Sequence, residues 1–195
     1  MLVDALPNDS TCVERAADGL REKLRQATTA AHRSLDAEFS DFDLTSLRGY
    51  RRFLEASAAA LLPLESALEQ AGVAHVFPDW PERSRSRAIK ADLDRLDGVA
   101  RPLCGAGPLN RNSVLGVMYV LEGSRLGAKF LLRSIAGNPL LERATRYLGH
   151  GAGKPLWRNF LLRLESEPVA SDDEAEITRG AHHAFAMFAE AAARP

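Results

Sequence analysis

Apolar residues recur along this chain at intervals of three and four, which is the spacing of one face of an α-helix. Such a stripe predicts a first helix from about residue 12 or 13 to residue 37, with its apolar face against a core. No segment keeps the strict alternation of a half-buried strand. The chain is therefore expected to form a single compact all-α domain. The residues of the first stripe are Leu20, Leu24, Ala27, Ala31 and Leu35.

The same periodicity continues to the end of the chain, interrupted by polar or Gly- and Pro-rich connectors. Thr45 is the expected N-cap of a second helix, in which Pro63 predicts a kink. Trp80 and Pro81 open a charged helix that extends to about residue 96, and its mixture of Arg with Asp and Glu indicates a solvated outer face. Further helices are expected over about 110–136, 140–148, 156–166 and 172–193, giving seven or eight in all. Residues 1–11 are expected to be flexible, and residues 12–195 to form the domain.

One apolar helix, expected over residues 110–136, contains glycines in its interior. Gly116, Gly123 and Gly127 share a face with Val120. Each glycine costs about 1 kcal/mol relative to alanine in a helix. A face without side chains allows another helix, or a flat ligand, to lie against the backbone. The spacing leaves both interpretations open.

A polar stripe follows the edge of the apolar face on the first helix, through Arg25, Thr28, His32 and Asp36. Because Asp36 stands four residues after His32, its carboxylate can accept the Nδ1 hydrogen of the imidazole. That contact would leave Nε2 available to a metal. Arg25 lies ~10 Å away along the axis, where it could meet an acidic group of a ligand. The alternative is a boundary histidine in an ordinary ion pair.

These two helices together favour a flat iron macrocycle held by one axial imidazole, with the opposite iron site open toward glycine backbone. The composition excludes other classes of protein. The net charge of −1 gives no sign of a nucleic-acid-binding surface. The two cysteines, Cys12 and Cys104, are far apart, which fits a reducing compartment. We find no secretory signal and no run long enough for a membrane span, so a cytoplasmic protein is expected.

Two sequence motifs closely resemble the heme oxygenase family, in particular its bacterial branch. They are ATTAAHRSLD around His32 and YVLEGSRLGAKFL from Tyr119 to Leu131. The resemblance implies an all-α fold in which heme b, both substrate and cofactor, lies between a proximal helix and a distal helix that kinks at Gly123 and Gly127. It also implies that O2 and an external electron donor convert heme to biliverdin, ferrous iron and carbon monoxide.

The resemblance also implies roles for individual residues. His32 would be the proximal ligand of the heme iron, with Asp36 as its partner. Ser124 occupies a position where mammalian-type members carry Asp and bacterial members carry Ser. Arg158, and less closely Arg163, match basic residues that hold the heme propionates. Catalytic roles are implied for Gly123, Ser124 and Gly127, and heme contacts for Arg25, Thr28, His32, Asp36, Tyr119, Gly123, Gly127, Arg158 and Phe185.

Partners implied by the resemblance are a reductase or a ferredoxin-type electron donor and a biliverdin acceptor such as a bacterial phytochrome. Neither a nucleic acid nor a membrane is expected as a partner. Two other functions remain open from the residues: a heme carrier or sensor on the same fold, and a helical interaction domain without a cofactor. Phe185 and Phe188 would line the heme pocket, or simply belong to the hydrophobic core.

Overall fold

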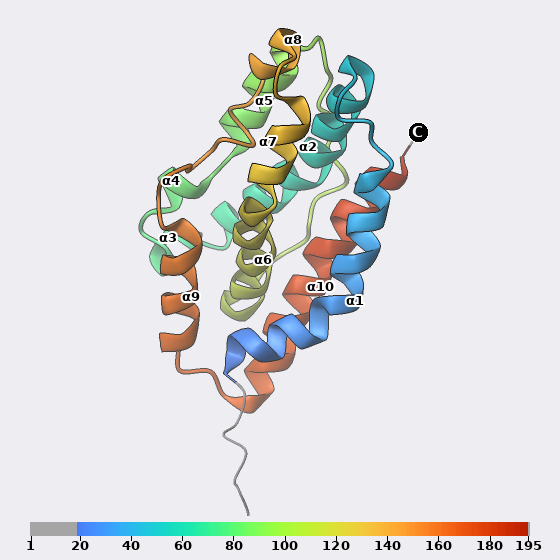
Figure 1. Cartoon of the computed structure of the whole chain (residues 1–195). Helices are drawn as coiled ribbons and strands as arrows, with labels where there is room; N and C mark the ends of the chain where they lie inside the picture. Colours follow the sequence, from blue (N-terminus) through green and yellow to red (C-terminus); the bar gives the residue numbers. More distant parts are fainter. Residues whose placement is uncertain (1–18, 195) are drawn as a thin grey trace, which may run out of the picture.

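The computed structural model describes residues 19–194, and every regular element among them is a helix (Figure 1). The all-α prediction is therefore confirmed. The predicted flexible segment and the first residues of the predicted first helix lie outside the described residues. The elements are α1 (Leu20–Ser40), α2 (Leu47–Gln70), α3 (Val73–Val76), α4 (Trp80–Arg83), α5 (Ser86–Arg95), α6 (Arg111–Gly123), the 3-10 helix η1 (Ser124–Leu126), α7 (Ala128–Ile135), α8 (Pro139–Glu142), α9 (Leu156–Ser166) and α10 (Ser171–Ala193).

The long C-terminal helix α10 organises the core, because it packs against α6, α1 and α2. Figure 1 shows α10 running beside α1 and close to α6. The crossing of α6 and α10 is very close. A Cβ atom on Gly116 would lie 1.9 Å from the backbone oxygen of Ile177, and one on Gly180 would lie 2.5 Å from the oxygen of Ser113. Gly116 therefore serves helix–helix packing.

Helix α1 is long but shallowly buried. Of its 21 residues, only Leu24 and Thr28 are buried. Ala31 and Leu35 are partly buried against the core, while Ala27 is exposed, so the expectation for Ala27 was wrong. The predicted stripe thus meets the core along only part of its length.

The start of α2 differs by one residue from the prediction. Its N-cap is Ser46, whose hydroxyl oxygen accepts a hydrogen bond of 3.0 Å from the amide of Gly49. The hydroxyl of Thr45 instead donates to Asp43 in the preceding turn, at 2.6 Å. Pro63 lies inside α2, which continues through it as one helix.

The charged segment from residue 80 to residue 96 departs furthest from the prediction. It was expected to be one solvated helix, but it is divided into α4 and α5 at Ser84 and Arg85. Arg83, Arg85 and Asp92 in this segment are buried. A run of charged residues indicates a solvent-exposed face when water is the partner of its side chains. Here the partners of the buried side chains are residues elsewhere in the fold.

The later elements follow the prediction more closely. Helices α9 and α10 occupy the expected ranges, whereas the short helix expected over 140–148 is reduced to α8 followed by turns. Within the described range, no helix is both long and apolar enough to cross a bilayer.

Candidate active site

The helix predicted over residues 110–136 is interrupted in its middle by the 3-10 helix η1, which separates α6 from α7. Gly123 and Gly127 border this turn, and both have right-handed φ values, −61° and −72°. A Cβ atom on Gly123 would meet the ring of Trp157 at 3.8 Å, and one on Gly127 would meet the backbone oxygen of Ser124 at 3.8 Å. Both are ordinary contacts. Neither glycine is therefore required by the packing of another helix, in contrast to Gly116.

The side chain of His32 projects from α1 and is 63% exposed. Its Nδ1 lies 2.9 Å from Oδ2 of Asp36, as the i,i+4 spacing predicts. An ionised carboxylate only accepts hydrogen bonds, so Nδ1 carries the hydrogen and the lone pair of Nε2 is directed away from Asp36. The ring of Phe185 on α10 meets the imidazole edge-on, with 6.0 Å between the centroids. Two neighbours therefore orient an imidazole that is otherwise open.

Thr28 and Tyr119 connect α1 to α6. Thr28 is buried, and its hydroxyl group donates to the backbone oxygen of Leu24 at 2.7 Å. Burial raises the pKa of Tyr119, and a side-chain hydrogen bond with Thr28 opposes that shift. The Tyr119 ring also packs against Trp157, with 5.7 Å between the centroids. The structure thus brings two of the predicted contact residues together at the junction of the two helices.

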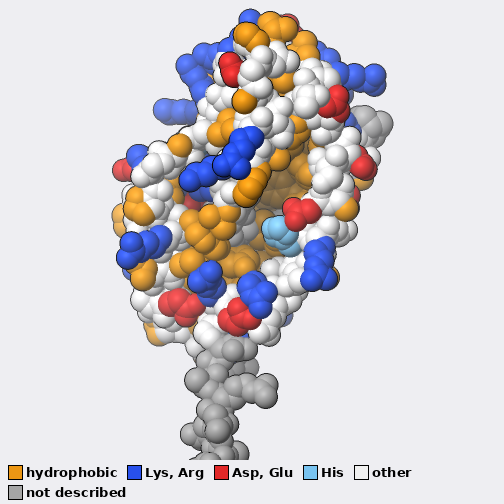
Figure 2. Space-filling view, in the orientation of Figure 1, with side chains coloured by type: hydrophobic (Ala, Val, Ile, Leu, Met, Phe, Trp, Pro, Cys, Tyr) orange, Lys and Arg blue, Asp and Glu red, His pale blue; other side chains and the backbone are white. Residues whose placement is uncertain are grey.

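A hollow lined by hydrophobic side chains opens on the face shown in Figure 2, and a histidine side chain stands at its edge. The described residues contain no group of three or more His, Cys, Asp or Glu that could hold a bare metal ion. A heme iron is different, because the porphyrin supplies four nitrogens and a single protein ligand is enough. One oriented imidazole, an apolar hollow and a helix turn bordered by two glycines therefore fit heme.

The predicted cations lie on α1 and α9. Arg25 pairs with Glu22, with 2.6 Å between Nη2 and Oε1, and this hydrogen bond is the main reason why the pKa of Glu22 falls to about 2. Arg158 is exposed on α9, and no described contact joins it to His32. Arg163 pairs with Glu167, with 2.8 Å between Nε and Oε1.

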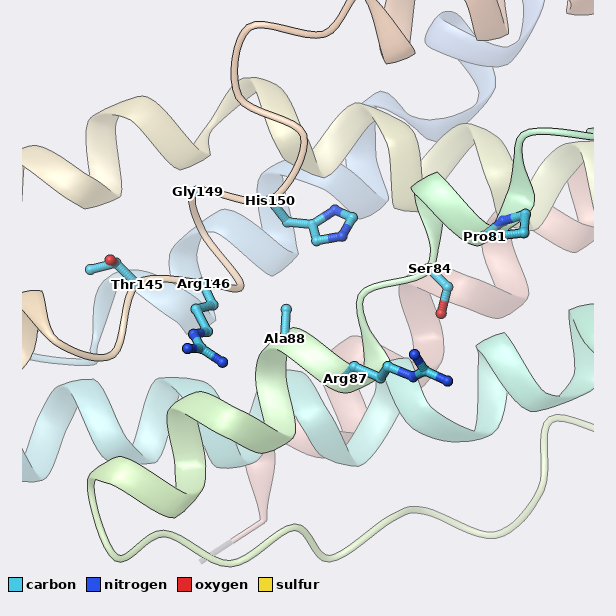
Figure 3. A pocket seen from close by; sticks show the side chains of 8 residues that line it. All are labelled: Pro81, Ser84, Arg87, Ala88, Thr145, Arg146, Gly149 and His150. Carbon is cyan, nitrogen blue, oxygen red and sulfur yellow. The ribbon is translucent and has the colours of Figure 1, made fainter.

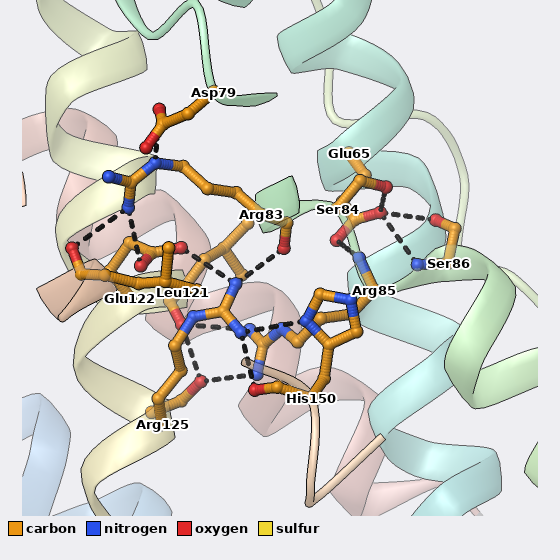
Figure 4. A network of polar contacts seen from close by, with 12 residues as sticks. Glu65, Asp79, Arg83, Ser84, Arg85, Ser86, Leu121, Glu122, Arg125 and His150 are labelled. Atoms are coloured by element: carbon orange, nitrogen blue, oxygen red, sulfur yellow. Dashed lines mark hydrogen bonds and ion pairs between the residues drawn. The ribbon is translucent and has the colours of Figure 1, made fainter. Parts of the chain in front are cut away.

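A cluster of buried charges lies against the η1 turn, and the sequence pattern did not predict it. Glu122 is 1% exposed, and its two carboxylate oxygens accept from Arg83 at 2.8 Å and from Arg125 at 2.9 Å (Figure 4). Arg83 also donates to Asp79 at 2.8 Å. A carboxylate inside an otherwise apolar helix was the one sequence signal that pointed to a buried cation. We refer to Arg83, Arg85, Glu122, Arg125 and His150 as the arginine cluster.

Arg85 holds the end of α6 in place. Its Nη2 donates to the backbone oxygen of Leu121 at 2.9 Å, and its Nη1 donates to Oγ of Ser124 at 3.1 Å. The Ser124 hydroxyl in turn donates to the same Leu121 oxygen at 2.8 Å. Ser124, which was predicted to be catalytic, thus has a structural part in fixing the turn between the two glycines.

Comparison with known proteins identifies the class of enzyme. The family model described as heme oxygenase matches residues 102–194. The chain is 27% identical to heme oxygenase PigA of Pseudomonas aeruginosa over 194 residues, covering 93% of this chain and 96% of the relative. It is 30% identical to a heme oxygenase of Xanthomonas campestris pv. campestris over 144 residues, covering 71% of this chain and 86% of the relative.

Two solved structures share the fold. A heme oxygenase from Neisseria meningitidis, studied with NO and CO bound, superposes with a TM-score of 0.74 at 24% identity, covering 90% of this chain and 91% of the other. The heme oxygenase from Leptospira interrogans gives a TM-score of 0.66 at 17% identity, covering 90% of this chain and 98% of the other. The architecture and the site define an all-α heme enzyme. The chain belongs to the heme oxygenase family.

Proposed function

We propose that this enzyme cleaves heme b oxidatively to biliverdin and releases ferrous iron and carbon monoxide, in the hollow between α1 and the η1 turn. The observation that carries the proposal is the open His32 imidazole, oriented by Asp36 at 2.9 Å. It is supported by Gly123 and Gly127, where added Cβ atoms would find nothing nearer than 3.8 Å.

On the proximal side, Nε2 of His32 is the ligand of the heme iron. The hydrogen bond from Nδ1 to Asp36 makes the imidazole a stronger donor and fixes its tautomer. The edge contact with Phe185 limits rotation of the ring. Bound heme supplies the iron that activates O2 and the porphyrin that is oxidised, and the protein supplies ligation, orientation and electrostatics.

On the distal side, Gly123 and Gly127 present backbone instead of side chains. Such a wall would let bound heme approach closely and would place no acidic group over its iron. The contacts of Arg85 with Leu121 and Ser124 keep this turn in position. The role of the chain at this face is therefore to restrict space.

Arg25 and Arg158 are the proposed partners of the heme propionates, and Thr28 and Tyr119 border the heme where α1 meets α6. Arg25 already contacts Glu22, so a propionate would compete with that carboxylate or share the guanidinium with it. The electrons come from an external donor of the reductase or ferredoxin type, and a bilin acceptor such as a bacterial phytochrome is one consumer of the product.

The first test is reconstitution of the purified protein with hemin, followed by addition of a reductant and O2. We expect the Soret band to disappear while a biliverdin band grows. A heme spectrum that survives these conditions unchanged would contradict the proposed reaction and favour a heme carrier or sensor.

The second test addresses the ligand. We expect His32→Ala to abolish turnover and shift the Soret band, and added imidazole to restore the band position in part. His182→Ala is the matched control, because His182 is an exposed histidine on α10. Full activity of the His32 variant without imidazole would remove His32 from the proposed role.

A further inference from the structure

A second recess, of about 480 Å³, lies between the first turn of α5 and the connection from α8 to α9 (Figure 3). Arg87, Arg146 and His150 are among its lining residues, and no carboxylate lines it. The recess adjoins the arginine cluster, because His150 contacts Arg125. Nothing in the proposed heme reaction uses this space.

The protonation of His150 follows from its partner. Nη1 of Arg125 lies 3.2 Å from Nδ1 of His150, and a guanidinium can only donate, so Nδ1 is the acceptor. Burial, and then the positive charges of Arg125 and Arg85, lower the pKa of His150 and favour the neutral ring. In that tautomer Nε2 carries the hydrogen. Figure 3 shows the ring projecting into the recess, so this face offers a neutral N–H donor.

The two arginines at the recess are exposed, and among the described contacts neither guanidinium has a carboxylate within hydrogen-bonding distance. The hydroxyl groups at the wall are already engaged. Ser84 donates to Glu65 at 2.6 Å, and Thr145 donates to the backbone oxygen of Glu142 at 3.0 Å. The donors that remain for a ligand are therefore those of Arg87, Arg146 and His150.

The arginine cluster beneath the recess contains charges of both signs, because Glu122 accepts from Arg83 and Arg125. Arg85 is 4% exposed, yet its guanidinium donates to a hydroxyl and a backbone oxygen and to no carboxylate. Its Nε, like that of Arg125, is buried without a hydrogen-bond partner. The nearby carboxylate of Glu65 accepts from the Arg85 amide and from serine donors instead. A buried cation without a paired carboxylate favours an anion in the nearest open space.

We propose that this recess binds a small oxyanion of the phosphate type, with Arg87 and Arg146 as its charge partners and Nε2–H of His150 as a neutral donor. Guanidinium groups match the oxygens of phosphate and carboxylate in geometry as well as in charge. The recess is open to solvent, and its volume of about 480 Å³ has room for a small ion or a phosphorylated small molecule.

Calorimetric titration of inorganic phosphate into the full chain without heme, at constant ionic strength, tests the site. We expect saturable binding at one site, with a Kd of ~1 mM or tighter. The double variant Arg87→Gln/Arg146→Gln is expected to weaken binding at least ~10-fold. In long-range proton–nitrogen NMR spectra, phosphate should shift the ring nitrogens of His150 more than those of the exposed His182.

A recess of about 430 Å³ beside α2 provides a matched control, because it contains arginines together with carboxylates. Arg48→Gln/Arg52→Gln removes the same charge there and should leave phosphate binding unchanged. Equal weakening by both double variants, or no saturation by phosphate, would overturn the proposal. Citrate is titrated in parallel, and saturation by citrate alone would overturn phosphate in favour of a carboxylate ligand. The measurements use heme-free protein, so they do not depend on the heme reaction.

Discussion

Replacing Gly116 by alanine is expected to destabilise the fold, whereas the same change at Gly123 is expected to leave it equally or more stable. Alanine gains about 1 kcal/mol over glycine in a helix interior. At Gly116 the new Cβ would lie 1.9 Å from the backbone oxygen of Ile177 and 2.6 Å from the amide nitrogen of Ala181, so α6 and α10 must separate. Overpacking of this kind costs up to about 3 kcal/mol, which leaves a net loss of about 2 kcal/mol.

At Gly123 the added Cβ would meet the Trp157 ring at 3.8 Å, and no separation is needed. The net effect there is between zero and a gain of about 1 kcal/mol. For a chain of this size, 1 kcal/mol corresponds to about 2–4 °C in Tm. We therefore expect Gly116→Ala to melt about 4–8 °C below the parent protein, and Gly123→Ala to melt at or slightly above it.

The measurement is thermal and urea unfolding of the heme-free protein, followed by circular dichroism. Each variant serves as the control for the other, because both carry the same substitution on one helix. An unchanged Tm for Gly116→Ala, or an equal loss in both variants, would refute the distinction between a glycine required by packing and a glycine with room for a Cβ atom.

Three further predictions concern the η1 turn and the buried charges packed against it. Glu122→Gln removes the buried carboxylate shared by Arg83 and Arg125, leaving Arg83 with Asp79 alone, and should cost about 3–5 kcal/mol in urea unfolding. Glu82→Gln, at an exposed pair, should cost about 0–1 kcal/mol. His150 has a lowered pKa in the folded state, so the unfolded chain binds more protons and stability falls as the pH drops below about 6.5. His150→Gln should flatten that slope in unfolding titrations and the exposed His182→Gln should not; equal slopes in all three proteins would contradict the assignment. Gly123→Val should bind hemin more weakly or turn it over more slowly, and normal turnover would argue against a close backbone wall.

Local sequence patterns predicted the parts of this structure that depend on neighbouring residues. The apolar periodicity located α9 and α10, and the i,i+4 spacing of His32 and Asp36 predicted a contact that is present at 2.9 Å. The role of His32 as a ligand stays a prediction. Such features are predictable because they are decided within one or two turns of one helix.

The failures concern residues whose partners are distant in the sequence. Arg83 belongs to a charge run that reads as solvated, yet its carboxylate partner Glu122 lies 39 positions later. The roles of the glycines also depend on a neighbour that is distant in the sequence. Only the position of α10 distinguishes Gly116, which is crossed by a backbone, from Gly123 and Gly127, where a Cβ atom would make only ordinary contacts. The spacing of residues along one helix does not show which other helix packs against each of its faces.

The shallow burial of α1 has a consequence for turnover. If heme is converted in the hollow between α1 and the η1 turn, as proposed, product must leave past one of these two walls. Helix α6 is held by its backbone contact with α10 at Gly116, whereas α1 buries only Leu24 and Thr28. Segments with few buried contacts open at the lowest free energy. If the proposed heme site is correct, we therefore expect α1, which carries His32, to move more readily than α6 when product is released.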